Sequence, residues 1–486
     1  MIQIFLPMIL AIGALLRLYN NTAIALWHDE AFSALYMRYP FSEMIYRIGL
    51  DVHPPLYYLI LRVWTSFAGN SLSSLRLLSI IFGVLTVWAG YLVAKTAFGS
   101  KRLALVAAFM LAANPFQIQY ALEARMYTLG TFLILLASYF LLKALSKDVL
   151  SSRKKYWFGF TLAVTAALYT HYYLIFSVAA LALYILFYAV ATRRIKNLLP
   201  AVISGASVFI LYLPWMKTFL EQVSRVQASY WIPPINRWSV PATLWKMVFG
   251  GPGIRHSVLI IASAISLLLI MYFLKKIRTP EKWLIMLGLM VPFLAAILIS
   301  IKTNLYLDRY FVFSSLFFTI LIAAALYKLP GFFLRWGMVI LFSAMVMLAF
   351  FKNWQLLDVG NKPGMAAAAE VVNLQAKKND KIFVGSSFIY FTFKYYNRSP
   401  IPPKLISDRL IRDIPHFSGT AILTDKDLIL NLNTYPKGQT VWLLWTTGFG
   451  GSKPSLPKNW KQQIQVKYAD APGFKGEIFV SRYVVN

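Results

Sequence analysis

The feature that most constrains this chain is a series of about eleven apolar runs, most of them near the roughly 20 residues that an α-helix needs to cross a bilayer. Because 59% of the 486 residues are hydrophobic and only 14% are charged, the composition is typical of a polytopic membrane protein. We therefore predict an α-helical fold with about eleven transmembrane helices. The first run lacks the basic segment of a signal peptide, so we expect it to be a retained helix. The runs occupy residues 2–18, 75–95, 103–121, 126–144, 156–171, 172–190, 198–216, 256–274, 283–301, 310–327 and 336–351.

Lysine and arginine gather in short clusters between these runs, for example at Lys101 and Arg102 and at Lys275 and Lys276. The formal net charge of +30 would suit a nucleic-acid partner only if the basic residues shared one face, so we expect no binding of nucleic acid. Basic residues favour cytoplasmic loops, so the clusters predict which loops face inward. The alternate loops, including the first one, are then extracytoplasmic.

Nine carboxylates precede residue 352, and seven of them fall in the predicted outer loops. The two on the inner side are Asp148 and Glu281. An ionised carboxylate near lipid needs water, a cation or a metal, and the interiors of the runs carry almost no charge. Chemistry in this chain is therefore expected on the outer side. The seven outer carboxylates are Asp29, Glu30, Glu43, Asp51, Glu123, Glu221 and Asp308.

The composition changes after Phe351, where a soluble domain is expected to begin. We predict a membrane domain at residues 1–351, with a first outer loop at 19–74, and an extracytoplasmic α/β domain at 352–486. The soluble domain is predicted to start with an amphipathic helix and to continue with strands separated by Gly, Pro and Asn. The helix is expected at 365–378, and the strands at 381–385, 441–445, 464–468 and 478–485.

Proline and tryptophan mark two other places in the membrane domain. Asn114 followed by Pro115 is expected to end the third span, because proline lacks a backbone donor and restricts its predecessor. Residues 217–255 are expected to form a long outer loop whose tryptophans lie at the level of the lipid headgroups.

The loop between the first two runs holds four of the nine carboxylates together with two histidines. Asp29 and Glu30 are adjacent and would point about 100° apart in a helix, so we expect only one of them to face a shared pocket. The other would serve structure or orientation. Pro54 favours extended backbone at His53, so Asp51 and His53 are expected to point the same way as an acid–imidazole pair. An ordinary polar loop is the alternative interpretation.

Two arginines fall at the predicted outer surface, Arg125 in the segment Glu123-Ala-Arg125-Met-Tyr127 and Arg309 in Leu-Asp-Arg-Tyr. A guanidinium group matches the geometry of phosphate, so the pair suggests an anionic ligand. Arginines that extend toward the headgroups without a ligand are the alternative. His171, in Tyr-Thr-His-Tyr-Tyr, is either a polar cap of a helix connection or a residue of the same pocket.

These motifs resemble one known group of membrane enzymes. Residues 27–30, Trp-His-Asp-Glu, followed by 51–56, Asp-Val-His-Pro-Pro-Leu, are similar to the first outer loop of the protein O-mannosyltransferases and of their bacterial relatives, including lipid A aminoarabinose transferases. The Glu-Ala-Arg-Met-Tyr segment and the Arg-Tyr pair before a late helix extend the resemblance. Enzymes of this group, glycosyltransferase family 39, have the GT-C fold and use polyprenyl-phosphate-linked sugars. The aminoarabinose enzymes have lysine where His53 stands.

The resemblance implies an inverting transfer of one sugar from a polyprenyl-phosphate donor to a hydroxyl of a protein, lipid or glycan acceptor outside the cell membrane. Asp29 and Glu30 are the implied catalytic pair, with Asp29 as the general base. Arg125 and Arg309 would neutralise the departing lipid phosphate, and His53 would add a contact to it. Further pocket candidates are Asp51, Glu123, Tyr127 and His171.

Several alternatives stay open from the sequence. A divalent cation is one, because metal dependence varies among such enzymes, although Asp51 and His53 are too few ligands to define a site. The absence of cysteine excludes thiolate ligands and a cysteine nucleophile. A lipid or solute transporter would place ionisable groups near the middle of the bilayer, where this chain has almost none. A scaffold for cell-envelope assembly leaves the acid-rich first loop unexplained.

Overall fold

The chain falls into two compact units, which are described separately. The helical unit comprises Met1–Tyr19, His53–Ile60 and Arg76–Asn353, and the mixed unit comprises the rest. The position of Asp148 lies outside the described residues. The computed structural model describes residues 2–19, 21–146, 153–195, 198–228, 231–251, 255–356, 364–470 and 476–486.

Eight helices in the described part of the chain are long and apolar enough to cross a membrane. The bent pair α6 (Lys101–Ala113) and α7 (Pro115–Ala121) passes the same test when taken together. Helices α1 (Ile2–Leu18) and α9 (Arg153–Leu168) are shorter, at 17 and 16 residues. The predicted polytopic α-helical fold is confirmed. The other helices with residues in this unit are α4 (Leu56–Ala68), α5 (Leu72–Phe98), α8 (Tyr127–Leu145), α10 (Leu174–Ala191), α11 (Leu198–Ala228), α12 (Ser239–Phe249), α13 (His256–Lys276), α14 (Lys282–Ser300), η3 (Asp308–Phe311), α15 (Val312–Tyr327) and α16 (Phe332–Leu356).

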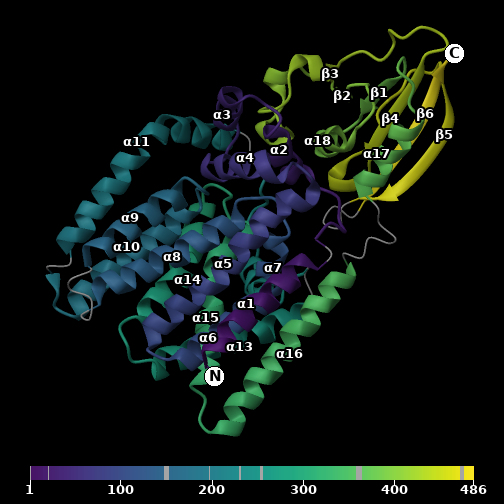
Figure 1. Ribbon diagram of the computed structural model, residues 1–486. Helices are drawn as coiled ribbons and strands as arrows, with labels where there is room; N and C mark the ends of the chain where they lie inside the picture. The colour runs from purple at the N-terminus through teal and green to yellow at the C-terminus, as the bar shows by residue number, and fades with distance from the viewer. Residues whose placement is uncertain are drawn as a thin grey trace. The chain divides into compact units, whose positions relative to one another are not determined.

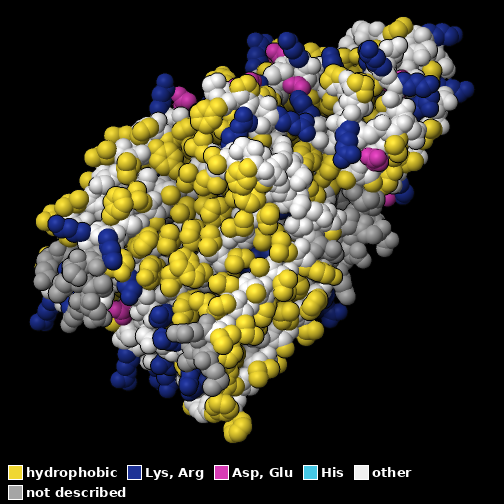
Figure 2. Space-filling model, viewed as in Figure 1, with side chains coloured by type: hydrophobic (Ala, Val, Ile, Leu, Met, Phe, Trp, Pro, Cys, Tyr) yellow, Lys and Arg dark blue, Asp and Glu magenta, His cyan; other side chains and the backbone are white. Residues whose placement is uncertain are grey.

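Helix α15 packs against most of its neighbours in this unit, whereas α16 runs along the outside of the bundle (Figure 1). In its most apolar stretch, 89% of the residues of the η3–α15 span are buried, against 11% for α13 and for α16. An apolar helix face that protein does not cover is stable in lipid rather than in water. Figure 2 shows hydrophobic side chains across the visible face of the helical unit, with Lys and Arg mostly toward its edges. The arrangement is that of a membrane-embedded bundle.

The third predicted run is broken between α6 and α7, which meet at an angle of 56°. Pro115 has no backbone N–H, and Asn114 is extended, so α6 ends where the sequence predicts. Asn114 then caps α7, because its Oδ1 accepts hydrogen bonds from the N–H groups of Phe116 and Gln117 at 2.9 and 3.1 Å. Its Nδ2 donates to the carbonyl of Met247 at 2.9 Å, which ties the break to α12.

Arg17 of α1 satisfies carbonyl groups that this break leaves free. In a continuous helix the carbonyl of Leu111 would accept from the N–H at position 115, which proline lacks. The carbonyl of Ala112 would accept from the N–H of residue 116, which bonds to Asn114 instead. Arg17, only 1% exposed, donates to these two carbonyls at 3.3 and 2.8 Å. Because an unsatisfied carbonyl in a bilayer costs several kcal/mol, the buried arginine stabilises the bend.

The expected long loop at residues 217–255 is wrong for most of its length. Helix α11 continues to Ala228, and α12 occupies Ser239–Phe249. Apolar residues keep helical spacing after Lys217, and no glycine or proline interrupts the sequence before Pro233, so the helix has no local reason to end at the membrane surface. Both helices position side chains discussed below.

The mixed unit contains a six-stranded sheet with the order β3-β2-β1-β4-β6-β5. The first four strands are parallel, and β6 pairs antiparallel with both β4 and β5. The strands are β1 (Lys381–Val384), β2 (Lys404–Ile406), β3 (Leu428–Ile429), β4 (Thr440–Thr446), β5 (Trp460–Ala469) and β6 (Glu477–Val485). The helices are α2 (His28–Tyr36), α3 (Phe41–Leu50), α17 (Gly364–Gln375), α18 (Ser387–Tyr396), η4 (Ile411–Asp413), η5 (His416–Ser418), η6 (Asp425–Asp427) and η7 (Gly448–Gly450).

Strand β4 lies at the centre of the sheet, and all but its first residue are buried. A nearly continuous apolar run is typical of a strand that is covered on both faces. The buried indole of Trp442 donates to Oδ2 of Asp380 at 3.0 Å, which satisfies the polar atom in this core. The predicted helix and four strands coincide with α17, β1, β4, β5 and β6, so the predicted C-terminal α/β domain is confirmed. The sequence did not indicate β2, β3 or α18.

The acid-rich first loop packs within the mixed unit, through contacts between α2 and α18. The ring centre of His28 lies 5.3 Å from that of Phe388 and 5.4 Å from that of Phe391. Just before α2, the backbone N–H of Leu26 donates to the hydroxyl of Tyr396 at 2.9 Å. In its contacts, the first loop therefore groups with the C-terminal segment of the chain.

Helix α3 is joined to the same unit by Arg47. Its guanidinium donates to the carbonyls of Ala421 and Ile422 at 3.1 and 3.2 Å, and it pairs with Glu43 one turn earlier at 2.7 Å. The ring of Tyr39 lies 4.2 Å below the same guanidinium. Charged, aromatic and backbone groups thus fix the loop helices in place.

Candidate active site

Arg125 is the centre of a group of polar side chains in the helical unit. It lies between α7 and α8 and is only 2% exposed. Its Nη1 donates a hydrogen bond to the hydroxyl of Tyr58 at 3.1 Å, and its Nη2 lies 3.0 Å from Nε2 of His53. Because a guanidinium can only donate, Nε2 of His53 accepts, and a neutral His53 ring carries its proton on Nδ1. Two residues that the sequence assigned to phosphate binding are therefore adjacent.

The backbone around Arg125 is held on both sides of the residue. Its N–H donates to the carbonyl of Glu123 at 2.7 Å, and its carbonyl accepts from Oγ of Ser79 at 3.3 Å. On the partner side, Pro54 and Pro55 end the first loop, and the next residue, Leu56, begins α4. These turns fix the start of α4, which carries Tyr58, against the segment that carries Arg125.

His171 belongs to the same polar group and comes from the connection between α9 and α10. Its ring centre lies 6.5 Å from that of His53, 5.9 Å from Tyr127 and 5.2 Å from Tyr310. Its Nδ1 accepts a hydrogen bond from the backbone N–H of Tyr173 at 3.1 Å, so the ring proton of the neutral form is on Nε2. The imidazole is thus oriented with its donor nitrogen away from the backbone.

The charge state of His171 follows from its surroundings. Burial lowers the pKa of His171 well below its ordinary value of 6.5, and the neighbouring His53, Arg125 and Arg309 lower it further. An imidazolium would be poorly solvated here and would be repelled by two guanidinium groups. His171 is therefore a neutral hydrogen-bond donor at physiological pH.

Arg309 lies in η3, directly before α15. Its guanidinium carbon is 5.7 Å from the ring centre of Trp231, a favourable cation–π distance. The preceding residue, Asp308, forms an ion pair with Lys246 of α12. Arg125 and Arg309 both lower the pKa of His171, so the two arginines influence the same histidine.

Asp29 and Glu30 lie in the mixed unit, in the first turn of α2, where the helix N-terminus favours carboxylates. Glu30 is fully buried, and its Oε2 accepts a hydrogen bond from the N–H of Trp27 at 3.4 Å. Asp29 is partly exposed, and its carbonyl accepts from Oγ of Ser33 at 3.4 Å. The two adjacent acids therefore have different surroundings.

The backbone ahead of His53 is extended at Asp51, where φ is −80° and ψ is −160°. Helix α3 runs to Leu50, and the N–H of Asp51 still bonds to the carbonyls of Arg47 and Ile48 at 3.1 and 3.2 Å. Residues 51–53 then form a turn and a bend before Pro54, and the pairing of Asp51 with His53 stays a prediction. Over the described ranges, no group of three or more His, Asp or Glu side chains is arranged to hold a metal ion.

The candidate residues thus fall into two sets. His53, Glu123, Arg125, Tyr127, His171 and Arg309 lie in the helical unit, and Asp29, Glu30 and Asp51 lie in the mixed unit. Sequence reasoning gave no role to Tyr58, although it lies only two residues after the motif at 51–56 and five residues after His53. The Pro-Pro pair between them was the available signal, because it predicts a helix start that holds both residues near one helix end.

The fold defines the class of protein. The described chain resembles the crystal structure of ArnT from Cupriavidus metallidurans bound to undecaprenyl phosphate, with a TM-score of 0.63 and 14% identity over 97% of both chains. It also resembles the archaeal oligosaccharyltransferase AglB from Archaeoglobus fulgidus in complex with an inhibitory peptide and a dolichol-phosphate. That match has a TM-score of 0.54 and 12% identity, over 81% of this chain and 63% of the other. The chain has the GT-C fold.

The sequence narrows the class further. Residues 52–217 match the family model described as dolichyl-phosphate-mannose-protein mannosyltransferase. The matched segment includes His53, Arg125 and His171. No curated protein matches the chain. The chain is thus a multi-pass membrane protein related to glycosyltransferases, and the predicted resemblance to the mannosyltransferase-like GT-C enzymes is confirmed.

Proposed function

We propose that this protein transfers one sugar from a polyprenyl-phosphate carrier to an acceptor hydroxyl on the extracytoplasmic face of the cell membrane, with inversion at the anomeric carbon. The observation that carries the proposal is the buried guanidinium of Arg125, held by His53 and Tyr58 within the segment that matches the mannosyltransferase family. The undecaprenyl phosphate bound by ArnT and the dolichol-phosphate bound by AglB support this class of lipid donor. The acceptor is a protein, a lipid or a glycan.

The polar side chains around Arg125 suit the departure of a lipid phosphate in such a reaction. As the bond between the anomeric carbon and the phosphate oxygen breaks, negative charge grows on the lipid phosphate. Arg125, fixed in direction by two neighbours, and Arg309 stabilise that charge without having to reorganise. His171 adds a neutral N–H donor, which contributes a hydrogen bond without a competing charge. The departing group is then a lipid monophosphate.

In this proposal Asp29 accepts the proton of the acceptor hydroxyl while the acceptor oxygen attacks the anomeric carbon from the face opposite to the phosphate. One carbon–oxygen bond forms and one breaks, so a single displacement inverts the configuration. The partial exposure of Asp29 supports its assignment as the base. The burial of Glu30 and its bond to Trp27 support a structural role for the second acid.

The direct test offers radiolabelled sugars on polyprenyl phosphate, both hexoses and pentoses, to the purified protein in lipid nanodiscs with protein, lipid and glycan acceptors. We expect acceptor-dependent release of lipid monophosphate and a product whose anomeric configuration is opposite to that of the donor. A product with retained configuration would contradict the single displacement. Movement of an intact lipid or solute into sealed vesicles, without release of phosphate, would favour a transporter instead.

A further inference from the structure

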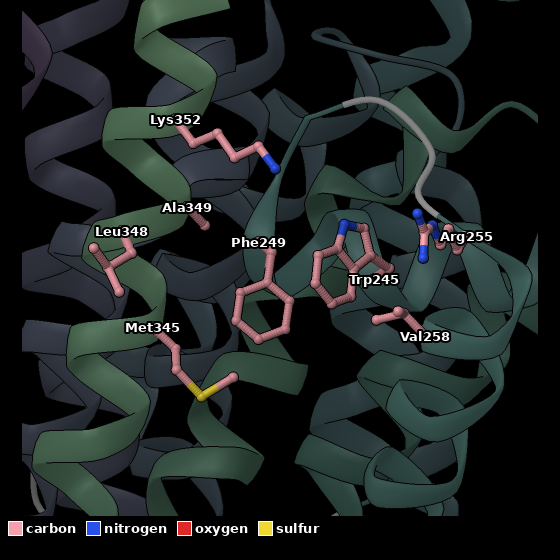
Figure 3. Close-up of a pocket in the computed structure, with 8 residues that line it drawn as sticks. All are labelled: Trp245, Phe249, Arg255, Val258, Met345, Leu348, Ala349 and Lys352. Carbon is pink, nitrogen blue, oxygen red and sulfur yellow. The ribbon is translucent and has the colours of Figure 1, made fainter.

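A pocket of about 560 Å³ lies in the helical unit among α12, the start of α13 and the end of α16 (Figure 3). This volume is typical of sites for small ligands. None of its lining residues belongs to the polar group around Arg125. The pocket and the candidate active site therefore have no residue in common.

Helical spacing explains the shape of the pocket. The lining residues of α16 are Met345, Leu348, Ala349 and Lys352, which follow the i, i+3, i+4, i+7 pattern of one helix face. From Lys352 to Met345 this face is about 10 Å long, at roughly 1.5 Å per residue. Trp245 and Phe249 of α12, spaced i and i+4, form the opposite wall. The result is a groove along α16.

The groove is amphipathic along its length. Figure 3 shows Lys352 and Arg255 toward one end, with Met345 and Val258 further along. Among the described residues, both basic side chains are exposed, no carboxylate lines the groove, and neither cation takes part in an ion pair. Arg255 directly precedes α13, and its position adds the positive end of a helix dipole to the two charges.

The surroundings of the groove indicate that it opens to lipid. Its two flanking spans, α13 and α16, have the smallest buried share of the eight, at 11%. Leu348 is 69% exposed, Met345 45% and Val258 37%. Apolar side chains at this exposure, on helices of membrane-spanning length, face acyl chains rather than water. The cations lie at the helix ends, where headgroups are found.

We propose that this groove binds an anionic phospholipid of the bilayer, with its phosphate between Arg255 and Lys352 and one acyl chain along the apolar face of α16. A phosphate placed between two basic side chains gains charge-assisted hydrogen bonds from both of them. The reacting donor must bring its phosphate to Arg125 in the proposed reaction, and the groove shares no residue with that site. The bound lipid is therefore a resident of the membrane that is not consumed.

Fluorescence of Trp245 provides the test, in nanodiscs that contain brominated phosphatidylglycerol or, at the same fraction, brominated phosphatidylcholine. The difference between wild type and Trp245→Phe isolates the signal of this one tryptophan. We expect stronger quenching by the anionic lipid. Each cation near a surface is worth roughly fivefold in affinity, so Arg255→Gln combined with Lys352→Gln should weaken the preference about 20- to 30-fold. The matched control combines Lys217→Gln and Lys302→Gln, two exposed lysines outside the groove, and should keep the preference.

Three results would overturn the proposal. Equal quenching by the two lipids would show that the groove has no preference for negative charge. Unchanged quenching in the Arg255 and Lys352 double variant would show that these cations do not hold the phosphate. Displacement of brominated phosphatidylglycerol by undecaprenyl phosphate, but not by unbrominated phosphatidylglycerol, would make the groove a site for the carrier lipid. None of these results depends on sugar transfer, so the outcome is independent of the proposed reaction.

Discussion

Replacing Arg125 with lysine tests whether this residue holds the donor phosphate through its two-pronged geometry. The structure shows a buried guanidinium whose Nη1 and Nη2 are directed by Tyr58 and His53. A lysine keeps the positive charge but presents a single nitrogen on a flexible stem, so it cannot reproduce both directions. Arg125→Gln removes the charge as well and should be the more damaging of the two variants.

The expected size of the effect follows from the contacts that are lost. A hydrogen bond to a charged group is worth about 1.5–3 kcal/mol, and bidentate pairs with phosphate are at the strong end. Loss of one such bond should therefore reduce kcat/KM for the lipid donor roughly 10- to 150-fold in Arg125→Lys. In Arg125→Gln the reduction of kcat/KM should be larger than this range, because the growing charge on the leaving phosphate is no longer offset.

The assay measures kcat/KM for a polyprenyl-phosphate sugar at saturating acceptor, on variants whose thermal unfolding shows that they are folded. Arg102→Gln is the matched control, since Arg102 is an exposed arginine in the first turn of α6 and should leave donor kinetics unchanged. If Arg125→Lys kept the kinetics of the wild type within about twofold, its side chain would have no role in phosphate binding and our reasoning about the site would be refuted.

Three further predictions concern other parts of the chain. In the folded protein the pKa of His171 lies well below its ordinary value of 6.5, so the ring stays neutral when the pH falls to that value. In the unfolded chain the same ring takes up a proton, so a lower pH favours unfolding. Thermal stability should therefore decrease from pH 7.5 to 5.5, and a His171→Gln variant with an undiminished slope would contradict this. Tyr396→Phe leaves the N–H before α2 without its acceptor at a cost of about 1–3 kcal/mol, and should lower kcat while donor KM stays constant. The chain has no cysteine, so a single introduced cysteine reports its own side of the membrane. Ser42→Cys and Ser452→Cys should react with an impermeant thiol reagent in intact cells, whereas Thr279→Cys should react only after permeabilisation. Protection of either serine position would overturn the topology.

Most of the helical unit was predictable because its signals are local. A run of apolar residues near the bilayer length specifies a span, and Asn114 with Pro115 specifies a helix end through backbone chemistry alone. The role of Arg17 was not predictable, because its guanidinium donates hydrogen bonds to carbonyl groups of a helix about 95 residues later in the sequence. The continuation of α11 to Ala228 was also not predicted, because the tryptophans that follow Lys217 favoured a loop at the headgroup level.

In the mixed unit, too, only elements with a clear local sequence signal were predictable. Strands β1, β4, β5 and β6 have apolar runs long enough to recognise, whereas β3 has two residues and β2 three. The sequence of α18, Ser-Phe-Ile-Tyr-Phe-Thr-Phe-Lys-Tyr-Tyr, is rich in aromatic and β-branched residues that favour strands, and its helix is set by tertiary packing against α2.

The candidate site was predictable in its residue types but not in its geometry. The family resemblance assigned both His53 and Arg125 to the phosphate, and only the fold brings their side chains to within 3.0 Å of each other. The rule about residues before proline suggested a pair of Asp51 with His53, and this pair stays a prediction, although Asp51 has extended backbone where α3 ends.

The central claim is a sugar transfer in which Asp29 accepts the acceptor's proton, and the most direct measurement compares Asp29→Asn with Glu30→Gln in transfer rate and in donor binding. Positioned acid–base catalysis is worth about 10²–10⁴-fold, so Asp29→Asn should lose that factor in turnover while it still binds the lipid donor. Glu30→Gln should lose less turnover and more thermal stability, because its carboxylate is buried against the start of α2. An Asp29→Asn protein that transfers sugar at the rate of the wild type would contradict the account.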